Sequence, residues 1–400
     1  MEPEIQPVSP EALPTKTSPG GLDQSGEATD QLLNSQSAHQ APGKKPTRDA
    51  AWVFIGGDGL RAGWSVLIFF VLTVLFAIPI GFVANSIARS VLHLKRGSFT
   101  PTAGLLQEIV LFLALLGASA VMALIERRRL LDYNLRGPRS LRHFAGGLVA
   151  GFLGLAVLVG GLAAGGWLQF GPVALSGAQI FGYAALWGAC FVLVGFFEEG
   201  MFRCYLQYTL TRGLNFWWAL GIEACLCSYL LLRAKGNGVW GVFAIALLGL
   251  VPCLLLELRK AQGSGFWQAA WVTSTLFGFI HTGNNGENWI GIFAAAAIGF
   301  VFCVSIWATG SAWWAIGCHA GWDWAETYFF GTADSGLPAK GHYLTTNPAG
   351  NVLWSGGADG PEGSLLVLGI ILLLLVAVLA IYGRRRVSAV AGPAPTGMQG

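Results

Sequence analysis

Long runs of apolar residues alternate with short polar loops along most of this chain. Crossing the hydrocarbon core of a bilayer as a helix takes about 20 apolar residues, with a usable range of about 17 to 25. The pattern therefore predicts an all-α fold, a polytopic transmembrane helix bundle of about 8 to 10 spans. Ten stretches approach or reach the required length, and they are Gly63–Ala84, Leu105–Ile125, Phe144–Ala164, Ile180–Phe197 running on into the next turns, Phe216–Leu232, Val239–Leu256, Phe266–Ile280, Trp289–Thr309, Ala312–Phe330 and Ser364–Tyr382.

Polar segments flank this apolar region at both ends. Residues 1–50 are rich in Pro, Ser, Gln and Gly and hold few large apolar side chains, so they cannot bury enough surface to offset the entropy of ordering. They also lack the basic and then apolar pattern of a signal peptide. We expect a disordered N-terminal tail over residues 1–50, a membrane domain over 55–385 and a disordered C-terminal tail over 386–400.

Basic residues in the loops predict the orientation of the chain, because Lys and Arg in short loops favour the cytoplasmic side. Such clusters lie before the first expected span, between the second and third, and after the last; Arg89, Lys95 and Arg96 in the first outer loop are the exception. The pattern predicts a multi-pass protein of the cell (inner) membrane with both termini in the cytoplasm. The clusters are Lys44, Lys45, Arg48 and Arg61; Arg127, Arg128, Arg129, Arg136, Arg139 and Arg142; and Arg384, Arg385 and Arg386.

Composition narrows the classes of function. Hydrophobic residues make up 54% of the 400 residues, charged residues 11%, and mean hydropathy is +0.57, which excludes a soluble enzyme. The net charge of +3 comes from 24 basic and 21 acidic residues, so nucleic acid is not an expected partner, whereas the lipid bilayer is. The 7 cysteines lie in apolar runs without a C-x-x-C pair, and we interpret them as packing residues.

A pair of acids stands deep in the fourth apolar stretch. Ionisable groups inside a membrane are costly and therefore rare unless function keeps them. Glu198 and Glu199 are followed by Arg203, one helical turn beyond Glu199. Neighbouring helical residues point about 100° apart, so Arg203 can hold one glutamate while the other faces a cavity. The alternative is an intramembrane ion pair without chemistry.

Two of the 6 histidines also lie in apolar segments. His281 closes the run STLFGFIH, and His319 is followed one turn later by Asp323. A buried Glu can act as a general base for water, while His can orient that water, donate to an oxyanion or bind a metal. The set favours hydrolysis. No cofactor is firmly predicted, but zinc held by His281, His319, Asp323 and Glu198 stays open, because no H-E-x-x-H motif decides the matter.

Three short motifs carry a resemblance to a known family. They are EExxxR at 198–203, FxxxH at 277–281 and HxxxD at 319–323. In this order they resemble the CAAX protease and bacteriocin-processing (CPBP, Abi-like) intramembrane endopeptidases, which include the type II CAAX prenyl proteases. The resemblance covers about residues 55–385, with a catalytic core near 180–330. It implies a protease whose substrate is a membrane-associated protein or peptide.

The resemblance also implies roles for individual residues. Glu198 would activate water together with His281, Arg203 would support the glutamate pair, and Glu199 would be secondary. His319 with the residue at position 323 would stabilise the oxyanion. The commoner residue there is Asn, and an ionised Asp323 only accepts hydrogen bonds, so it must be protonated, orient His319 or bind metal. A metal-dependent protease therefore stays open.

A second departure is the spacing between the first two motifs. About 80 residues separate them, and the excess predicts an inserted helical hairpin near residues 214–262. Glu223 lies within it, and we expect a structural role for that acid. Strict counting of ten spans places Glu198 toward the inner end of one helix and His281 toward the outer end of another. Either the site lies at mid-depth on tilted helices, or one span is re-entrant.

Three classes of function remain at this point. The first is an intramembrane endopeptidase that hydrolyses a peptide bond of a membrane-associated or CAAX-like substrate. The second is a non-catalytic immunity or interaction protein on the same fold, because a fold does not by itself imply chemistry. The third is a transporter, which would call for an internal repeat that the sequence does not display. The identity of the substrate and its prenylation stay open.

Overall fold

The computed structural model describes residues 53–56, 59–94, 100–234, 236, 238–261, 263–284, 286–334, 336 and 340–383. All of these belong to one compact unit that begins at Val53. The predicted tails over 1–50 and 386–400, and the basic cluster at 384–386, lie outside the described residues.

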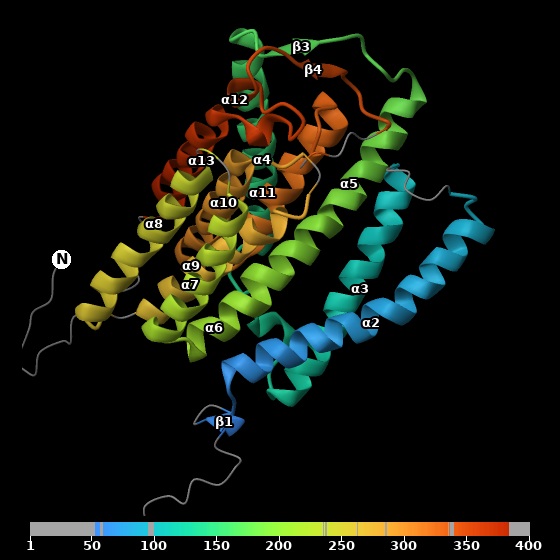
Figure 1. Cartoon of the computed structure of the whole chain (residues 1–400). Coiled ribbons are helices and arrows are strands. Elements are labelled where there is room, and N and C mark those ends of the chain that lie inside the picture. Colours follow the sequence, from blue (N-terminus) through green and yellow to red (C-terminus); the bar gives the residue numbers. More distant parts are fainter. Residues whose placement is uncertain are drawn as a thin grey trace, which may run out of the picture. The chain divides into compact units, whose positions relative to one another are not determined.

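The first part of this unit is a set of long helices, as the apolar runs predict (Figure 1). The longest is a continuous helix made of α5, the π-helix η3 and α6, which together span Ala178–Gly213 with 36 residues. The elements are β1 (Ile55–Gly56), β2 (Gly59–Leu60), α2 (Ala62–Ser90), α3 (Pro101–Ile125), η2 (Leu130–Asp132), α4 (Ser140–Ala164), β3 (Leu168–Phe170), α5 (Ala178–Glu199), η3 (Gly200–Leu206) and α6 (Gln207–Gly213).

The second part continues the bundle and ends with another apolar helix. Among the described residues the strands are short and form two separate antiparallel pairs, β1 with β2 and β3 with β4, so the fold is an all-α polytopic helix bundle, as predicted. The elements are α7 (Phe216–Arg233), α8 (Gly238–Leu258), α9 (Ser264–His281), α10 (Trp289–Thr309), α11 (Trp313–Asp323), η4 (Trp324–Phe330), β4 (Thr346–Pro348), α12 (Val352–Ser355), η5 (Pro361–Gly363), α13 (Leu365–Val378) and η6 (Leu379–Gly383).

Eight helices of the described part are long and apolar enough to cross a membrane. This number lies within the predicted range of about 8 to 10. Two of the ten apolar stretches, Phe266–Ile280 and Ala312–Phe330, form α9 and α11 with η4 and are not among the eight. The physical reason is burial: ten residues of α9 and nine of the eleven in α11 are buried. Protein surrounds these two helices, so their side chains need not be uniformly apolar. They are the helices that carry His281 and His319.

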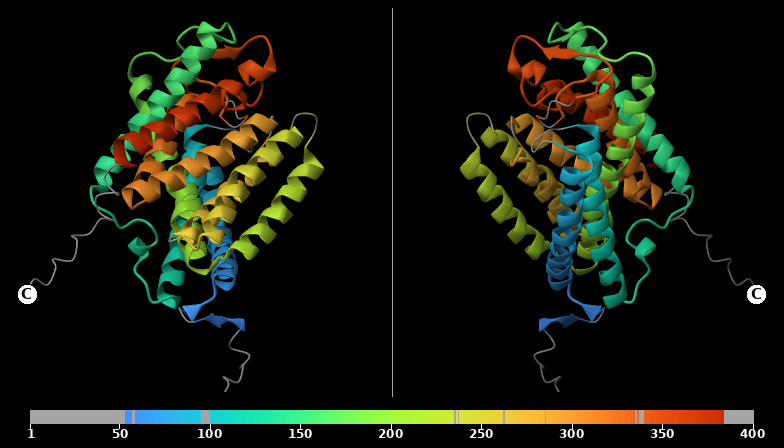
Figure 2. Two further views of the ribbon diagram at one scale, coloured as in Figure 1. Left: turned by 90° about the vertical axis from the view of Figure 1, so that its left-hand side faces the viewer. Right: turned by 90° about the vertical axis from the view of Figure 1, so that its right-hand side faces the viewer.

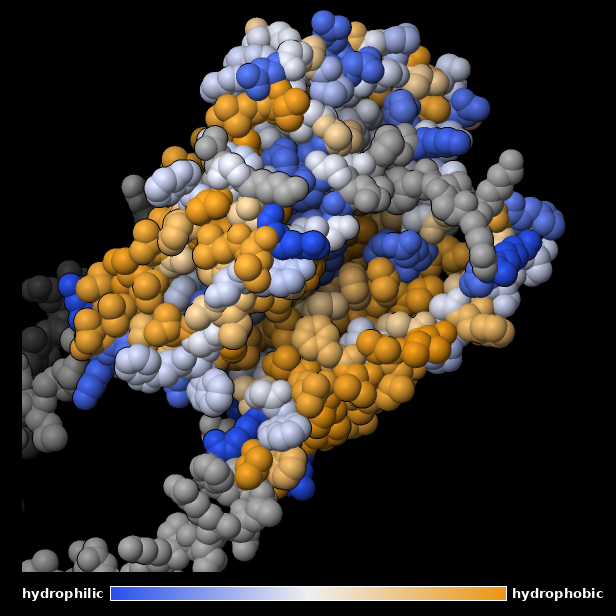
Figure 3. All heavy atoms as spheres, in the orientation of Figure 1, coloured by the Kyte–Doolittle hydropathy of each residue, from blue (hydrophilic) through white to orange (hydrophobic). Residues whose placement is uncertain are grey.

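The outer helices present apolar side chains over their exposed faces. On α2, Phe82 is 74% exposed and Ile78 is 65% exposed, and on α8 Leu248 is 68% exposed. Figure 3 shows hydrophobic residues over the sides of α2 and α8, with polar residues gathered over the loops near β3, β4 and α12. An exposed apolar belt between polar ends is the surface that a bilayer requires. The chain is a multi-pass membrane protein.

Helix α11 lies deep in the bundle because glycines let it approach α4. A side chain added at Gly147 or Gly151 of α4 would overlap the backbone of α11 at Trp314 and Cys318. The relationship is reciprocal, since a side chain at Gly317 or Gly321 would overlap the α4 backbone at Phe144 and Leu148. Small residues four positions apart are how membrane helices reach close backbone contact. Here the contact fixes the helix that holds His319 and Asp323.

Helices α7 and α8 form a hairpin at one side of the bundle, seen in the yellow-green ribbons of Figure 2. They lie within the segment 214–262 where the sequence predicts an inserted hairpin. Glu223 of α7 is 2% exposed, and the Cys227 thiol lies 3.9 Å from its Oε2 atom. Glu223 does not line the main cavity described below. A structural role for this acid stays a prediction.

Candidate active site

The two glutamates of the first motif lie near the middle of the long helix formed by α5, η3 and α6. Glu198 is the 21st of its 36 residues, counted from Ala178. At 1.5 Å per residue this helix is about 54 Å long, much longer than the ~30 Å hydrocarbon core. A helix that long places Glu198 at mid-length, so the acid need not lie near a membrane surface. A site at mid-depth on tilted helices therefore stays a prediction, and the length of this helix is compatible with it.

A π-helical turn begins directly after the glutamate pair. Glu199 ends α5, and η3 carries Arg203 with Nε 3.2 Å from the Glu199 Oε2 atom. Both side chains have an exposed fraction of 0%. Single π-turns in helices occur frequently at functional sites. The ion pair expected from the spacing is present. Of the two glutamates, Glu199 is the one that pairs with Arg203.

Arg203 is enclosed by aromatic rings. Its guanidinium carbon lies 4.4 Å from the ring centre of Phe277, 5.5 Å from Phe302 and 5.6 Å from Phe202. A methyl group added at Gly299 would overlap its Nη2 atom. In the described part of the chain, its Nη1 and Nη2 atoms have no hydrogen-bond partner. Glu199 and the ring faces are therefore the main compensation for this buried charge.

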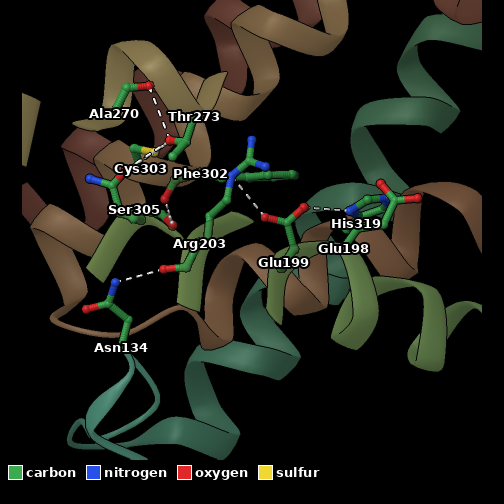
Figure 4. Close-up of polar contacts among 11 residues, drawn as sticks. Asn134, Glu198, Glu199, Arg203, Ala270, Thr273, Phe302, Cys303, Ser305 and His319 are labelled. Atoms are coloured by element: carbon green, nitrogen blue, oxygen red, sulfur yellow. Dashed lines mark hydrogen bonds and ion pairs between the residues drawn. The ribbon is translucent and has the colours of Figure 1, made fainter. Parts of the chain in front are cut away.

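Glu199 also reaches the second histidine (Figure 4). Its Oε1 atom lies 2.8 Å from Nδ1 of His319. A carboxylate accepts, so the Nδ1–H of His319 donates, which fixes the tautomer and turns Nε2 toward the other acids. His319 Nε2 lies 3.5 Å from Asp323 Oδ2 and 3.8 Å from Glu198 Oε2. Glu199 therefore holds the Nδ1 atom of His319, and Asp323 lies near its Nε2 atom. Orientation of His319 is one of the roles that the sequence leaves open for Asp323.

His281 is the last residue of α9, and a backbone contact orients its ring. Nδ1 lies 2.7 Å from the carbonyl oxygen of Phe277, one turn earlier. A carbonyl can only accept, so Nδ1 carries the proton and donates it, and Nε2 of the neutral ring has a free lone pair. The ring centres of Phe277 and His281 are 4.8 Å apart, the packing that the spacing of the second motif predicts.

A cavity of about 350 Å³ brings three motifs together. Its lining includes Glu198, His281, His319 and Asp323, whereas Glu199 and Arg203 lie behind it. Glu198 Oε2 is a buried oxygen with no hydrogen-bond partner among the described residues. The arrangement thus offers a carboxylate and two imidazoles to one shared cavity. It can hold water beside a base and a donor.

Several acids on the cavity wall were not singled out from the sequence. Glu108 of α3 is 8% exposed and lines the cavity, next to Gln107 in the chain. The sequence contains a signal for this residue, because Glu108 is an acid within the apolar stretch Leu105–Ile125, where ionisable groups are rare. Glu287, Asp334 and Glu362 also line the cavity, but they come from loops and from η5, where acids are ordinary.

These loop acids have unusual protonation behaviour. Burial, with the nearby charges of Asp359 and Glu362, raises the pKa of Glu287 to about 9. Burial and the charge of Glu362 raise the pKa of Asp334 to about 7, and they do the same for Asp359. An acid whose pKa is raised in the folded state stabilises the fold at low pH and loses that contribution as pH rises through the raised value. Near neutral pH these acids therefore keep part of their protons, which lowers the negative charge of this wall.

The predicted zinc ligands do not gather their donor atoms at one point. Among the described residues, one group of His, Cys, Asp or Glu has all its ligand atoms within 4.8 Å of one another, and it consists of Glu326, Asp334 and Glu362. His281, His319, Asp323 and Glu198 share the cavity but do not form such a group. Nδ1 of His319 is already engaged by Glu199. These four residues do not fit a closed metal site as placed, and we derive no chemical step through a metal there.

A comparison with known protein families matches the segments that contain the helices of the candidate site. A model of the family described as "Type II CAAX prenyl endopeptidase Rce1-like" matches residues 180–261 and 253–325. These segments hold all three motifs and less than half of the chain. The match confirms the predicted family. Among curated proteins and solved structures, nothing matches the chain.

The match to the Rce1-like family model supports a coarse statement of function. At the level of the family, the match supports a CAAX-type intramembrane endopeptidase with a peptide substrate in a lipid environment. The matched segments contain Glu198, His281 and His319, the side chains that meet at the cavity.

Proposed function

We propose that the chain hydrolyses a peptide bond of a membrane-associated, CAAX-like substrate with a water activated by Glu198 and His281. The observation that carries this proposal is the cavity among the membrane helices, which is lined by both of these side chains and by His319. A carboxylate with an unpartnered oxygen and an imidazole with a free Nε2 are suited to remove a proton from water. Neither a nucleophilic Ser nor a Cys is needed.

The remaining groups act on the other side of the scissile carbonyl. His319 is held by Glu199 at Nδ1, so its Nε2–H, when protonated, points into the cavity between Asp323 and Glu198. Two neighbouring carboxylates stabilise that proton. A positioned N–H donor is what a tetrahedral oxyanion requires. Arg203 is a positioning residue, because it touches Glu199 and lies outside the cavity lining.

A cleavage assay tests this function directly. The purified chain, reconstituted in lipid nanodiscs, is given a peptide that ends in a prenylated CAAX sequence, and its products are weighed by mass spectrometry. We expect cleavage within the CAAX sequence, with the unprenylated peptide as the matched control for substrate class. Cleavage of neither peptide, by protein that is folded and monodisperse, would favour a non-catalytic role.

Asp323 distinguishes two forms of the mechanism. In the metal-free form, the side chain of Asp323 exchanges a hydrogen bond with His319 Nε2. Asp323→Asn keeps a polar side chain of the same volume that can also form this bond. We therefore expect kcat to fall by less than about tenfold. Incubation with a chelator selective for zinc over Ca²⁺ and Mg²⁺ should leave wild-type activity unchanged. Loss of activity with the chelator, restored by zinc and accompanied by weaker zinc binding in Asp323→Asn, would contradict the metal-free form.

A further inference from the structure

Three acids from separate segments converge beside the cavity. Glu326 comes from η4, Asp334 from the loop that follows it, and Glu362 from η5. One carboxylate oxygen of each lies within 4.8 Å of the others. Three negative charges at this separation repel one another strongly away from bulk water. Something positive must offset them if they are all ionised.

The hydrogen bonds that Glu326 and Asp334 accept come from neutral groups. The indole N–H of Trp322 is shared between Glu326 Oε2 at 3.1 Å and Glu362 Oε1 at 2.8 Å. The Thr327 hydroxyl donates to Asp334 Oδ2 at 2.8 Å. Over the described residues, neither Glu326 nor Asp334 forms an ion pair with Lys, Arg or His. Neutral donors thus support Glu326 and Asp334 without balancing their charge.

The buried side chain of Glu326 is a second, separate observation that points to a ligand at this cluster. Its side chain is 0% exposed, and its Oε1 atom has no hydrogen-bond partner in the part of the chain that the structure describes. An unpartnered carboxylate oxygen in the interior is costly, and each such atom in a native fold calls for an ion, a proton or water. The orphaned oxygen belongs to the residue that anchors the acid cluster in the bundle.

We propose that Glu326, Asp334 and Glu362 bind a hard divalent cation, Ca²⁺ or Mg²⁺. The ligands are all carboxylate oxygens, which these ions prefer, and the set holds no Cys or His to favour zinc. Ca²⁺ takes oxygens at about 2.3–2.6 Å and Mg²⁺ at about 2.0–2.1 Å, so opposite ligands lie about 4–5 Å apart. Oxygens within 4.8 Å of one another fit around a single ion of this size.

The cavity supplies the remaining requirements of such a site. Asp334 and Glu362 line it, so an ion has a route to the cluster and room for water ligands. The bound ion would fasten Asp334 and η5 to Glu326 of the bundle. It would also lower the negative charge of the wall that faces the substrate. This role goes beyond the hydrolysis proposed above and does not depend on it.

The test uses the full chain in detergent or nanodiscs after treatment with EDTA, which is then removed. Thermal unfolding is followed by tryptophan fluorescence, and about 5 mM Ca²⁺, Mg²⁺ or Zn²⁺ is added in separate arms. We expect Ca²⁺ or Mg²⁺ to raise Tm by about 3 °C or more, as a ligand that binds only the folded state does. Equilibrium dialysis should find roughly one ion per chain. Asp334→Asn and Glu362→Gln should abolish both effects.

A matched control separates the site from general screening of charge. Asp132→Asn removes an acid that is paired at 3.4 Å with Arg136, away from the acid cluster, and should keep the full cation response. The proposal is wrong if neither Ca²⁺ nor Mg²⁺ changes Tm of the wild type, if zinc alone does, or if Asp334→Asn and Glu362→Gln respond as the wild type does. Stabilisation by acid without any cation effect would mean that the cluster shares protons instead. Because Tm is measured without substrate, none of these results depends on cleavage.

Discussion

Glu198→Gln is expected to lower the kcat of peptide cleavage by about 10²- to 10⁴-fold, the usual contribution of a general base. The amide keeps the volume of the carboxylate but cannot take a proton from water. Glu198 is 26% exposed to the cavity and has a contact longer than a hydrogen bond to His319, at 3.8 Å. Its loss should therefore leave Tm nearly unchanged. Steady-state kinetics and thermal unfolding of the same preparation measure both quantities.

Glu199→Gln provides the matched comparison, because it changes the neighbouring residue in the same way. Glu199 is fully buried between Arg203 at 3.2 Å and His319 at 2.8 Å. Its neutral isostere should lower Tm as well as activity, since it leaves the guanidinium unbalanced and frees the tautomer of His319. Wild-type activity in Glu198→Gln would remove Glu198 from the mechanism. Equal losses of Tm in the two variants would make the pair purely structural.

Arg203→Ala is expected to lower the free energy of unfolding by about 3–5 kcal/mol, the cost of stranding a buried charge. The variant leaves Glu199 without its cation and opens space against the Phe277 ring. The yield of monodisperse protein should fall sharply, and the surviving fraction should unfold at a lower temperature. Size-exclusion chromatography and thermal unfolding in detergent measure these effects.

A second variant separates loss of charge balance from loss of packing. Glu199→Gln combined with Arg203→Met removes both charges and keeps most of the volume, so it should recover much of the stability lost in Arg203→Ala. The recovered protein should stay inactive if Glu199 is needed to orient His319. An Arg203→Ala protein as stable as the wild type would show that the Glu199–Arg203 pair does not stabilise the fold.

The sequence predicted the parts of this fold that depend on composition and short spacing. Apolar runs predicted the membrane helices, and the four-residue spacing from Glu199 predicted its ion pair with Arg203. The spacing of Phe277 and His281 likewise predicted their contact. These features follow from helical geometry within one element. The segments matched by the family model contain the same three motifs.

Features that arise between elements could not be predicted in this way. Helices α9 and α11 look like spans from their apolar content, but close packing through residues such as Gly147 and Gly317 places α11 inside the bundle. Similarly, Asp334 and Glu362 are ordinary loop acids in the sequence, and only the path of the chain after η4 brings them to Glu326. A pattern along one helix carries no information about which loop folds back onto it.

Cleavage in water enriched with oxygen-18 tests the central claim most directly. One turnover of the wild-type chain on the prenylated peptide should place a single heavy oxygen in the new carboxylate, without a covalent peptide adduct on the protein. Glu198→Gln, at the same concentration and in the same time, should give no labelled product. Labelled product from Glu198→Gln at the wild-type rate, or an acyl adduct on the wild-type protein, would contradict the account of a water activated by Glu198.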